Sequence, residues 1–407
     1  MKVLFISPHY PEEMQSFTRG LREVGAEVYG AGDVPEAQLP AHVRQNLRGY
    51  VQVPELLKSE GAALAQLAPL AERLGVDRIE CLWEPCVLLA ASLRERLGIA
   101  GMSRDTVLGF RDKTLMKRRL VAAGIRVPRF ARVSSAAECY EAATEIGYPV
   151  VIKPIDGAGS ADTFAVTNAE QLKQVLTQLG HLKEANLEEF IDGDEFTYDT
   201  VCIDGVPHFE SVTKYYPKPM DGRHNEWISP AQLTYADPFA HPELHGGIAQ
   251  GREVLKALGM GTGFTHMEWF RKPDGEIVFG EIAARAPGGK LVDGMNYAND
   301  FDVFREWARA ACWHSYEGKP SKSYNVAAIF KRALGKGRIQ RIIGTQALRE
   351  RCGPGLLAME LTPPGQLRRD WLNTLIGDGF IILRHQDLET CQSMMWQAIK
   401  NVRLYAA

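Results

Sequence analysis

The first hundred residues alternate short apolar runs with stretches in which apolar residues recur at helical spacing. Short continuous apolar runs predict buried strands, and apolar residues three or four positions apart predict helices. Strands that alternate with helices usually form a parallel sheet with helices on its faces, so we expect an open parallel sheet. The predicted strands are Lys2–Ser7, Glu27–Tyr29 and Arg78–Trp83, and the predicted helices are Phe17–Val24, Ala62–Leu74 and Leu88–Leu97.

The loop after the third predicted strand is a candidate ligand site, because open parallel sheets bind ligands beyond the carboxyl ends of their strands. Glu84 lies in this loop. The more ordinary role for such a carboxylate is at the start of a helix. The first turn of the predicted sheet lacks the G-x-G-x-x-G fingerprint of dinucleotide-binding proteins, so the sheet need not bind NAD.

A second pattern begins near residue 111 and contains a glycine-bearing loop. One helix is expected to end at Ala123, another to span Ala136–Ile146, and a strand to span Tyr148–Pro154. The loop of residues 155–163 follows at once, and its small residues would let backbone N–H groups approach phosphate oxygens closely. An ordinary hairpin loop is the alternative.

Two charged segments accompany this loop. Lys153 lies at the end of the strand before the loop, and a lysine ammonium is suited to phosphate. The alternative is a strand-end lysine whose stem covers apolar surface. Residues 185–199 predict a strand, an acidic turn and a second strand, which suits a hinge between two subdomains. An exposed acidic hairpin is the alternative there.

Two glutamates thirteen residues apart, Glu268 and Glu281, lie in apolar strands on either side of a tight turn. The turn, residues 271–276, contains Pro and Asp-Gly, which favour reversal of the chain. A hairpin would place both carboxylates side by side among buried residues. Two buried carboxylates stay ionised only when a cation holds them, and Mg²⁺ prefers one or two carboxylates together with phosphates. Two solvent-facing glutamates on an edge hairpin are the alternative.

Composition narrows the function classes. A chain of 407 residues exceeds what one compact core usually holds, so two to four subdomains are expected. With 47 basic and 50 acidic residues the net charge is −3, which provides no field for nucleic acid or an anionic membrane. No transmembrane run or signal peptide is evident, so a cytoplasmic protein is expected. The seven cysteines are scattered singly and predict reduced core thiols.

Taken in order along the chain, these motifs resemble the ATP-grasp superfamily. The series is Asp112-Lys113, Lys153-Pro154 with the glycine loop, Glu188 with Glu195, and Glu268 with Glu281 and Arg285. The resemblance is strongest over residues 105–300. It implies an N-terminal open parallel sheet, then an ATP-grasp fold with a lid subdomain and an antiparallel-sheet core, and a C-terminal α+β extension. The implied domains are residues 1–105, 106–190 with the lid, 191–320 with the metal site, and 321–407.

The resemblance implies which residues bind ATP. Two lysines contact its phosphates and a glycine-bearing loop covers them. A hinge segment addresses the adenine edge, and an acidic residue further along binds the ribose hydroxyls. In that order, the matching residues are Lys113 and Lys153; Gly157, Gly159 and Ser160; Glu188, Glu189, Phe190 and Ile191; and Glu195.

The resemblance also implies a metal site and a catalytic arginine. Glu268 and Glu281 match the carboxylates that hold Mg²⁺, with Mn²⁺ as an alternative. Many members carry Asn two residues after the second glutamate, and Ala283 stands there instead, so one metal or two are left open. Arg285 matches an arginine near the transferred phosphate. A structural ion pair of this arginine, for example with Asp293, is the alternative.

Residues 279–290 are most similar to the carboxylate–amine ligase branch, which includes L-amino-acid ligases. The implied function is an ATP-dependent ligase that joins a carboxylate to an amine through an acyl-phosphate and releases ADP and phosphate. A bicarbonate- or carbamate-activating enzyme and a nucleotide-binding regulator without turnover are the alternatives. The implied partners are ATP and two small substrates, without nucleic acid or membrane, and a homodimer is left open. The candidate substrate residues are Lys214, Trp227, Gly288 and Gly289.

Beyond residue 325 the pattern predicts strands and a final helix without a catalytic constellation. The stretch Cys352–Leu367 is rich in Pro and Gly. We expect this region to close the substrate side or to form an oligomer interface. The predicted strands are Val326–Phe330, Ile342–Ile343 and Phe380–Leu383, and the predicted helix is Leu388–Tyr405.

Overall fold

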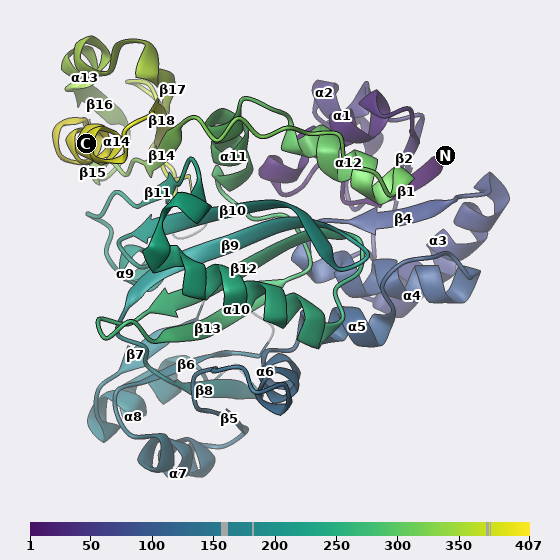
Figure 1. Cartoon of the computed structure of the whole chain (residues 1–407), viewed down its shortest axis with the longest axis horizontal. Coiled ribbons are helices and arrows are strands. Elements are labelled where there is room, and N and C mark those ends of the chain that lie inside the picture. The colour runs from purple at the N-terminus through teal and green to yellow at the C-terminus, as the bar shows by residue number, and fades with distance from the viewer. Residues whose placement is uncertain (156–161, 181–182, 372–373, 375) are drawn as a thin grey trace.

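The computed structural model describes residues 1–155, 162–180, 183–371, 374 and 376–407. Their strands form four sheets, and the largest of these has eight strands and runs through the middle of the molecule (Figure 1). The N-terminal sheet lies at the right in Figure 1, a small unit of residues 130–189 lies at the bottom, and the C-terminal residues lie at the upper left. This combination of an α/β sheet with α+β units is the fold class that the sequence predicts.

The N-terminal strands form a parallel sheet in the order β3-β2-β1-β4, as expected. The strand β3 was not predicted, because all four of its residues are at least partly exposed and show no alternation. The elements are β1 (Lys2–Ile6), α1 (Ser16–Glu23), β2 (Glu27–Gly32), α2 (Ala41–Arg44), β3 (Gly49–Gln52), α3 (Glu60–Leu74), β4 (Arg78–Cys81), α4 (Val87–Leu97) and α5 (Arg104–Gly109).

Residues 130–189, called the 130–189 unit below, form an antiparallel sheet in the order β5-β8-β6-β7 with two helices packed against it. The predicted strand, turn and strand of residues 185–199 are confirmed. The first of these strands belongs to this unit and the second to the central sheet, so the turn connects the two. The helix α6 (Lys113–Ala122) precedes the unit. The elements of the unit are β5 (Phe130–Val133), α7 (Ala136–Ile146), β6 (Val150–Pro154), β7 (Phe164–Val166), α8 (Ala169–Gln178) and β8 (Ala185–Glu189).

The central sheet has the order β13-β12-β9-β10-β11-β14-β18-β17, and all its neighbours are antiparallel. Helix α10 crosses one face of this sheet (Figure 1). Gly251 of α10 allows this close approach, because a Cβ there would lie 2.2 Å from a ring carbon of Tyr198. The elements are β9 (Asp194–Ile203), β10 (Val206–Tyr216), α9 (Pro219–His224), β11 (Ala231–Thr234), α10 (Pro242–Leu258), β12 (Gly263–Arg271), β13 (Ile277–Ala283), α11 (Leu291–Asn299) and α12 (Val303–Trp313).

The C-terminal residues add strands to the central sheet and build a small sheet of their own, in the order β15-β19-β16. The predicted final helix is too long: α14 ends at Asn401, and residues 403–406 form β19 between two other strands. The Pro- and Gly-rich stretch contains a strand, β17. The elements are β14 (Asn325–Phe330), β15 (Leu334–Gly335), β16 (Ile339–Ile343), α13 (Thr345–Cys352), β17 (Leu356–Leu361), β18 (Gly379–His385), α14 (Leu388–Asn401) and β19 (Arg403–Ala406).

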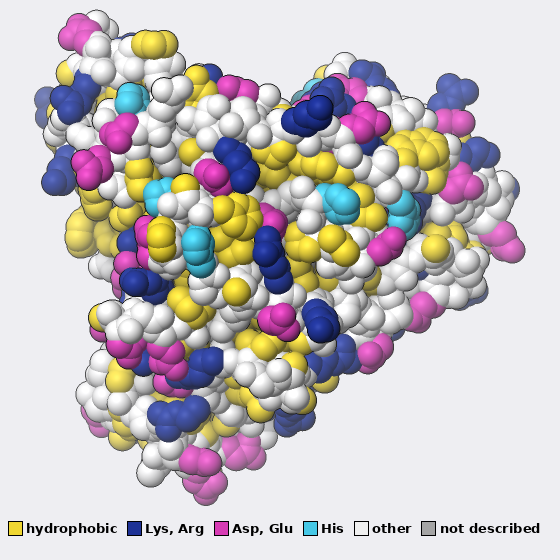
Figure 2. Space-filling view, in the orientation of Figure 1, with side chains coloured by type: hydrophobic (Ala, Val, Ile, Leu, Met, Phe, Trp, Pro, Cys, Tyr) yellow, Lys and Arg dark blue, Asp and Glu magenta, His cyan; other side chains and the backbone are white. Residues whose placement is uncertain are grey.

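The surface and the cysteines agree with the expectations from composition. Basic and acidic side chains are interspersed over the face shown in Figure 2. All seven cysteines are buried and free, so each lies in the interior as expected. No helix among the described residues is long and apolar enough to cross a membrane.

Candidate functional site

A cavity of about 620 Å³ lies where the N-terminal sheet, the 130–189 unit, the central sheet and the C-terminal residues meet. Each part of the molecule contributes charged or aromatic side chains to its wall. Most of the site residues predicted from the sequence line this one cavity. Those residues are Lys113, Lys153, Glu188, Glu189, Phe190, Ile191, Glu195, Glu268, Glu281, Arg285 and Gly288.

The two predicted metal carboxylates lie opposite each other on a hairpin. Glu268 on β12 and Glu281 on β13 are direct partners in the antiparallel register, and both line the cavity. The turn between the strands closes with a hydrogen bond from the Lys272 amide to the Glu276 carbonyl (2.9 Å). Tyr215 Oη donates to Glu268 Oε1 (3.3 Å). The predicted hairpin, with its carboxylates side by side, is confirmed.

The two predicted phosphate lysines converge on one of these carboxylates from separate segments. Lys113 is the first residue of α6, which Asp112 caps by accepting hydrogen bonds from two backbone N–H groups. Its Nζ lies 3.5 Å from Glu281 Oε2, and Lys153 Nζ lies 3.8 Å from the same oxygen. Lys153 Nζ also lies 3.0 Å from Glu188 Oε2. Positive charge from two chain segments is therefore concentrated beside the hairpin.

A third lysine, Lys117, belongs to this cluster and was missed by sequence reasoning. It lies one helical turn after Lys113 on α6, is fully buried, and donates from Nζ to Glu188 Oε1 (2.5 Å). Burial lowers the pKa of Lys117 to about 8, although the charge of Glu188 opposes this shift. The spacing of four residues on a predicted helix places the two lysines on one face, and this was the available signal.

The charged side chains of the cavity shift the pKa values of two of its glutamates in opposite directions. Burial would raise the pKa of Glu281, but Lys113, Lys153 and nearby cations lower it to about 2, so this carboxylate is ionised at neutral pH. Burial, together with the charge of Glu268, raises the pKa of Glu195 well above its usual range. The negative charge is thus fixed at the hairpin, and the predicted ribose-binding carboxyl takes up a proton more readily.

The donor set fits a magnesium ion that is shared with phosphate. Glu268 and Glu281 are carboxylates on facing strands, and the lysine contacts of Glu281 are long for hydrogen bonds. In the described part of the chain, no group of three or more His, Cys, Asp and Glu side chains could hold a metal. Two carboxylates with phosphate oxygens are nevertheless the donors that Mg²⁺ ordinarily uses. Ala283 supplies no further ligand.

The predicted hinge residues all line the cavity, but the two carboxylates among them have different partners. Glu188 points to Lys117 and Lys153, whereas the carboxylate of Glu189 accepts hydrogen bonds from Arg126. The remaining hinge residues, Phe190 and Ile191, also line the cavity. The carboxylate of Glu188 is therefore occupied by two lysines in this structure.

Arg285 lies in the cavity wall and pairs with a different acid from the one proposed. Its Nε donates to Glu84 Oε2 (2.5 Å), while Asp293 pairs with Lys290 (3.4 Å). The alternative of an ion pair with a nearby acid is therefore present in the structure, but the acid is Glu84 and not Asp293. Glu84 begins a short 3₁₀ helix after β4 and also lines the cavity. It therefore lies at a helix start and at the candidate site, the two positions considered for it from the sequence. The N-terminal sheet thus supplies the carboxylate that orients this arginine.

Of the four candidate substrate residues, only Gly288 lines the cavity. Lys214 projects from the opposite face of the sheet from Tyr215, and its Nζ pairs with Asp194 (2.7 Å) outside the cavity lining. Trp227 is 69% exposed and also lies outside the lining. The amide of Gly289 donates to Glu13 Oε1 (3.0 Å), and Gly288 beside it lines the cavity. Gly157, Gly159 and Ser160 fall outside the described residues.

The C-terminal region contributes residues that no sequence signal marked. Arg332 follows β14, is 7% exposed and lines the cavity. Its Nη1 donates to the carbonyls of Gly222 (2.6 Å) and Asn225 (2.9 Å), and its guanidinium lies 4.5 Å from the ring centroid of Trp371. Trp371 also lines the cavity. The expectation that this region closes the substrate side is consistent with these contacts.

Comparison with known proteins identifies the domain that carries the site. Residues 118–288 match the model of the ATP-grasp domain. Over 226 residues the chain is 31% identical to the L-arginine-specific L-amino acid ligase of Bacillus subtilis, and the match covers 53% of this chain and 52% of that protein. Over 88 residues it is 42% identical to a D-alanine–D-alanine ligase of Clostridium perfringens, with 21% of this chain and 29% of that protein covered.

The chain therefore spans about half or less of the length of these curated relatives. Among solved structures, an L-amino acid ligase from Bacillus licheniformis matches with a TM-score of 0.79 at 19% identity, and the match covers 100% of this chain and 98% of that chain. At this identity the similarity concerns the fold. Residues 118–288 of this chain, which carry most of the cavity residues, therefore match the ATP-grasp domain.

Proposed function

We propose that this protein is an ATP-dependent ligase that joins a carboxylate to an amine through an acyl-phosphate and releases ADP and phosphate. The observation that carries the proposal is the convergence of Glu268 and Glu281 with Lys113 and Lys153 around one cavity. Relatives named as L-amino acid and D-alanine ligases support the same reaction class. Free amino acids are accordingly the first substrates to examine.

Each group in the cavity has a role in this reaction. Lys113 and Lys153 would bind the polyphosphate, and Glu268 and Glu281 would hold Mg²⁺, whose chemistry when bound is to neutralise charge on the phosphates. A substrate carboxylate would attack the γ-phosphorus, with ADP leaving, and an amine would then displace phosphate from the acyl carbon. Phosphoryl transfer asks little covalent chemistry of a protein, so positioning and charge stabilisation account for most of the catalysis.

Arg285 is the residue we assign to the transferred phosphoryl group. A guanidinium can donate parallel hydrogen bonds to phosphoryl or carboxylate oxygens, and a lysine ammonium does not reproduce this planar fork. Glu84 holds Nε of Arg285 in the cavity wall and so fixes the direction of the fork.

The test is release of ADP by the purified protein with Mg²⁺ and a panel of amino acids, dipeptides and bicarbonate. We expect turnover that requires an acid and an amine together. Glu281→Gln should lower kcat by about 10²-fold or more, since it removes a charge-stabilising group, while ATP binding measured by calorimetry persists. Lys58→Ala, at a lysine whose side chain is 71% exposed, is the matched control.

Two results would contradict the proposal. ADP release that needs bicarbonate but no amino acid would favour the bicarbonate-activating alternative. Tight ATP binding without turnover on any member of the panel, and with Glu281→Gln indistinguishable from the parent, would favour a regulator.

A further inference from the structure

Arg126 lies where the chain passes from α6 toward the 130–189 unit, and its main chain is fixed to the central sheet. Its carbonyl accepts a hydrogen bond from the amide of Phe279 (3.0 Å). Phe279 lies on β13, the edge strand of the central sheet, two residues before Glu281. The backbone at Arg126 therefore moves with the hairpin that carries both metal carboxylates.

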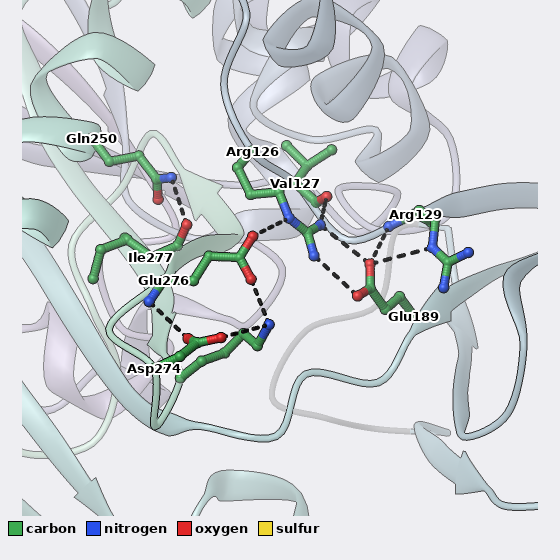
Figure 3. Close-up of polar contacts among 9 residues, drawn as sticks. Arg126, Val127, Arg129, Glu189, Gln250, Asp274, Glu276 and Ile277 are labelled. Carbon is green, nitrogen blue, oxygen red and sulfur yellow. Dashed lines mark hydrogen bonds and ion pairs between the residues drawn. The ribbon is translucent and has the colours of Figure 1, made fainter.

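The side chain of Arg126 joins three chain segments (Figure 3). Its Nε donates to Glu276 Oε1 (2.9 Å) in the turn of the hairpin. Its Nη2 and Nη1 donate to Glu189 Oε1 (3.0 Å) and Oε2 (3.2 Å), which forms a two-pronged contact with the last residue of β8. The amide of Arg129 adds a third hydrogen bond to Glu189 Oε2 (3.0 Å).

These contacts lie at the connection between the 130–189 unit and the central sheet. The chain enters the unit after Arg126 and leaves it after Glu189, and the two crossings are paired by a bond from the Glu189 amide to the Arg129 carbonyl (2.8 Å). The leaving segment also packs tightly, because a Cβ on Gly193 would lie 2.6 Å from the Arg271 carbonyl oxygen. Both crossings are thus held against the turn end of the hairpin.

The contact with Glu189 bears on the cavity through its neighbour. Side chains alternate along a strand, so Glu189 faces Arg126 while Glu188 faces Lys117 and Lys153. Any rotation of β8 that breaks the pair of Arg126 and Glu189 also moves Glu188 and the strand β6 beside it, which carries Lys153.

Both acids keep their charge at neutral pH. Burial would raise the pKa of Glu189, but hydrogen bonds from Arg126 and the Arg129 amide lower it overall. Hydrogen bonds from Lys272 and Arg126 lower the pKa of Glu276. Charged, bidentate contacts of this kind have a defined direction as well as energy, which a single ion pair between flexible side chains lacks.

We propose that Arg126 is a positioning residue that sets the angle at which the 130–189 unit holds Lys153 and Glu188 against the metal hairpin. Glu276 orients the guanidinium from the hairpin turn, and Glu189 accepts its hydrogen bonds from the 130–189 unit. The proposal rests on nucleotide binding in the cavity, as argued above. It assigns to Arg126 no contact with ATP.

The test compares Arg126→Ala with Arg252→Ala. Arg252 makes a similar two-pronged contact with Glu210, at 2.8 and 2.8 Å, away from the two crossings. Without nucleotide, Arg126→Ala should show faster hydrogen exchange at residues 127–130 and 185–191 and unchanged exchange in β9 and β12. With Mg²⁺ present, it should bind ATP about 3- to 10-fold more weakly, in line with the loss of two partly exposed ion pairs. Arg252→Ala should change neither measurement.

Two further variants keep the proposal open to contradiction. Arg126→Lys keeps the charge without the fork, so it should restore ATP affinity only in part. Glu276→Gln removes the anchor of the guanidinium and should resemble a mild form of Arg126→Ala, which provides a result even where the alanine variant fails to fold. If Arg126→Ala and Glu276→Gln both showed the hydrogen exchange and the ATP affinity of the parent protein, the role of Arg126 would be contradicted and the proposed function would stand. A parent protein that does not bind ATP would overturn the proposed function and this inference with it.

Discussion

Glu188 and Glu189 are neighbours in the sequence, yet they serve different networks because successive side chains of a strand point to opposite faces. One carboxylate is buried between Lys117 and Lys153 in the cavity. The other lies at the connection between the two parts of the ATP-grasp domain and accepts hydrogen bonds from Arg126. A substitution at either position would therefore change a different property of the protein.

Lys117 is expected to stabilise the fold through Glu188. Lys117→Met would leave this buried carboxylate with Lys153 as its remaining cationic partner among the residues that contact it here, and removing one partner of a buried pair costs about 3–5 kcal/mol. Because one lysine remains, we expect a loss of about 2–4 kcal/mol in the free energy of unfolding. Urea denaturation at pH 7 without nucleotide measures it.

The control is the double variant Lys117→Met with Glu188→Gln. Removing the carboxylate charge as well should recover much of the loss, since the double variant no longer buries an underpaired charge. Strictly additive effects of the two substitutions would show that the lysine and the glutamate do not stabilise the fold through each other.

At single positions, the sequence identified residues whose motif is local and missed those whose partners come from elsewhere. Glu268 and Glu281 were found because a hairpin turn lies between them. Once the two strands pair across that turn, the two side chains lie on the same face of the sheet. Lys214 was proposed as a substrate residue, but its Nζ pairs with Asp194 outside the cavity lining, and a strand pattern alone does not say which face meets the cavity. Trp371 carried no signal, since its position depends on the packing of the C-terminal residues.

Among the elements, strong periodicity gave the correct helices, and weak periodicity hid short strands. The predicted helix Ala136–Ile146 coincides with α7, whose apolar residues recur every three or four positions. The strand β19 was read as an extension of α14, because its alternation over four residues is too short to distinguish from a helix end. Local pattern fixes long elements, whereas short strands form only when neighbouring strands pair with them.

Lys331 gives α14 a pH-dependent contact. Its Nζ is buried and donates to the carbonyls of Ala398 and Ile399 (3.1 Å each) near the end of this helix. Burial and the charge of Arg403 lower the pKa of Lys331 to about 7. The folded state therefore binds fewer protons than the unfolded state between pH 7 and the ordinary lysine pKa of about 10.4.

Stability should consequently rise with pH over this window, by up to about 1.4 kcal/mol per pH unit from this group. Lys331→Met should flatten that part of the profile, because methionine does not titrate. The measurement is the free energy of unfolding from urea titrations between pH 7 and 10. A slope that is the same in the parent and in Lys331→Met would show that the amine is charged in the folded protein.

At the scale of the whole molecule, the cavity is assembled from four parts that are distant in sequence. The N-terminal sheet supplies Glu84, the 130–189 unit supplies Lys153, and the C-terminal residues supply Arg332 and Trp371. The sequence predicted this order of parts through its resemblance to a family. It did not predict which walls face the substrates, because those walls are set by how the parts pack.

Trp371 is expected to limit the size of the substrate. Trp371→Ala would open the wall beside Arg332, and a change of pocket volume alters discrimination between apolar groups by about 10- to 200-fold per methylene. We therefore expect about a 10-fold shift of kcat/KM toward bulkier substrates, with KM for ATP unchanged. The measurement is ADP release with a series of amino acids of increasing side-chain size.

Trp227→Ala is the matched control, because this tryptophan is mostly exposed and lies outside the cavity lining. It should leave the order of preferred substrates unchanged. An unchanged order in Trp371→Ala as well would place the substrate elsewhere in the cavity.

The entering and leaving segments of the 130–189 unit lie side by side, so these residues form a unit that could be exchanged as a whole. Because the chain enters and leaves this unit at adjacent points, joined by the Glu189–Arg129 backbone bond, the unit has the topology of an insertion. A chimaera that carries the corresponding segment of a relative would leave the strands that bear Glu268 and Glu281 untouched. Exchange of this unit, in evolution or in the laboratory, would replace the segment that carries Lys153 and Glu188 and keep the hairpin and Lys113.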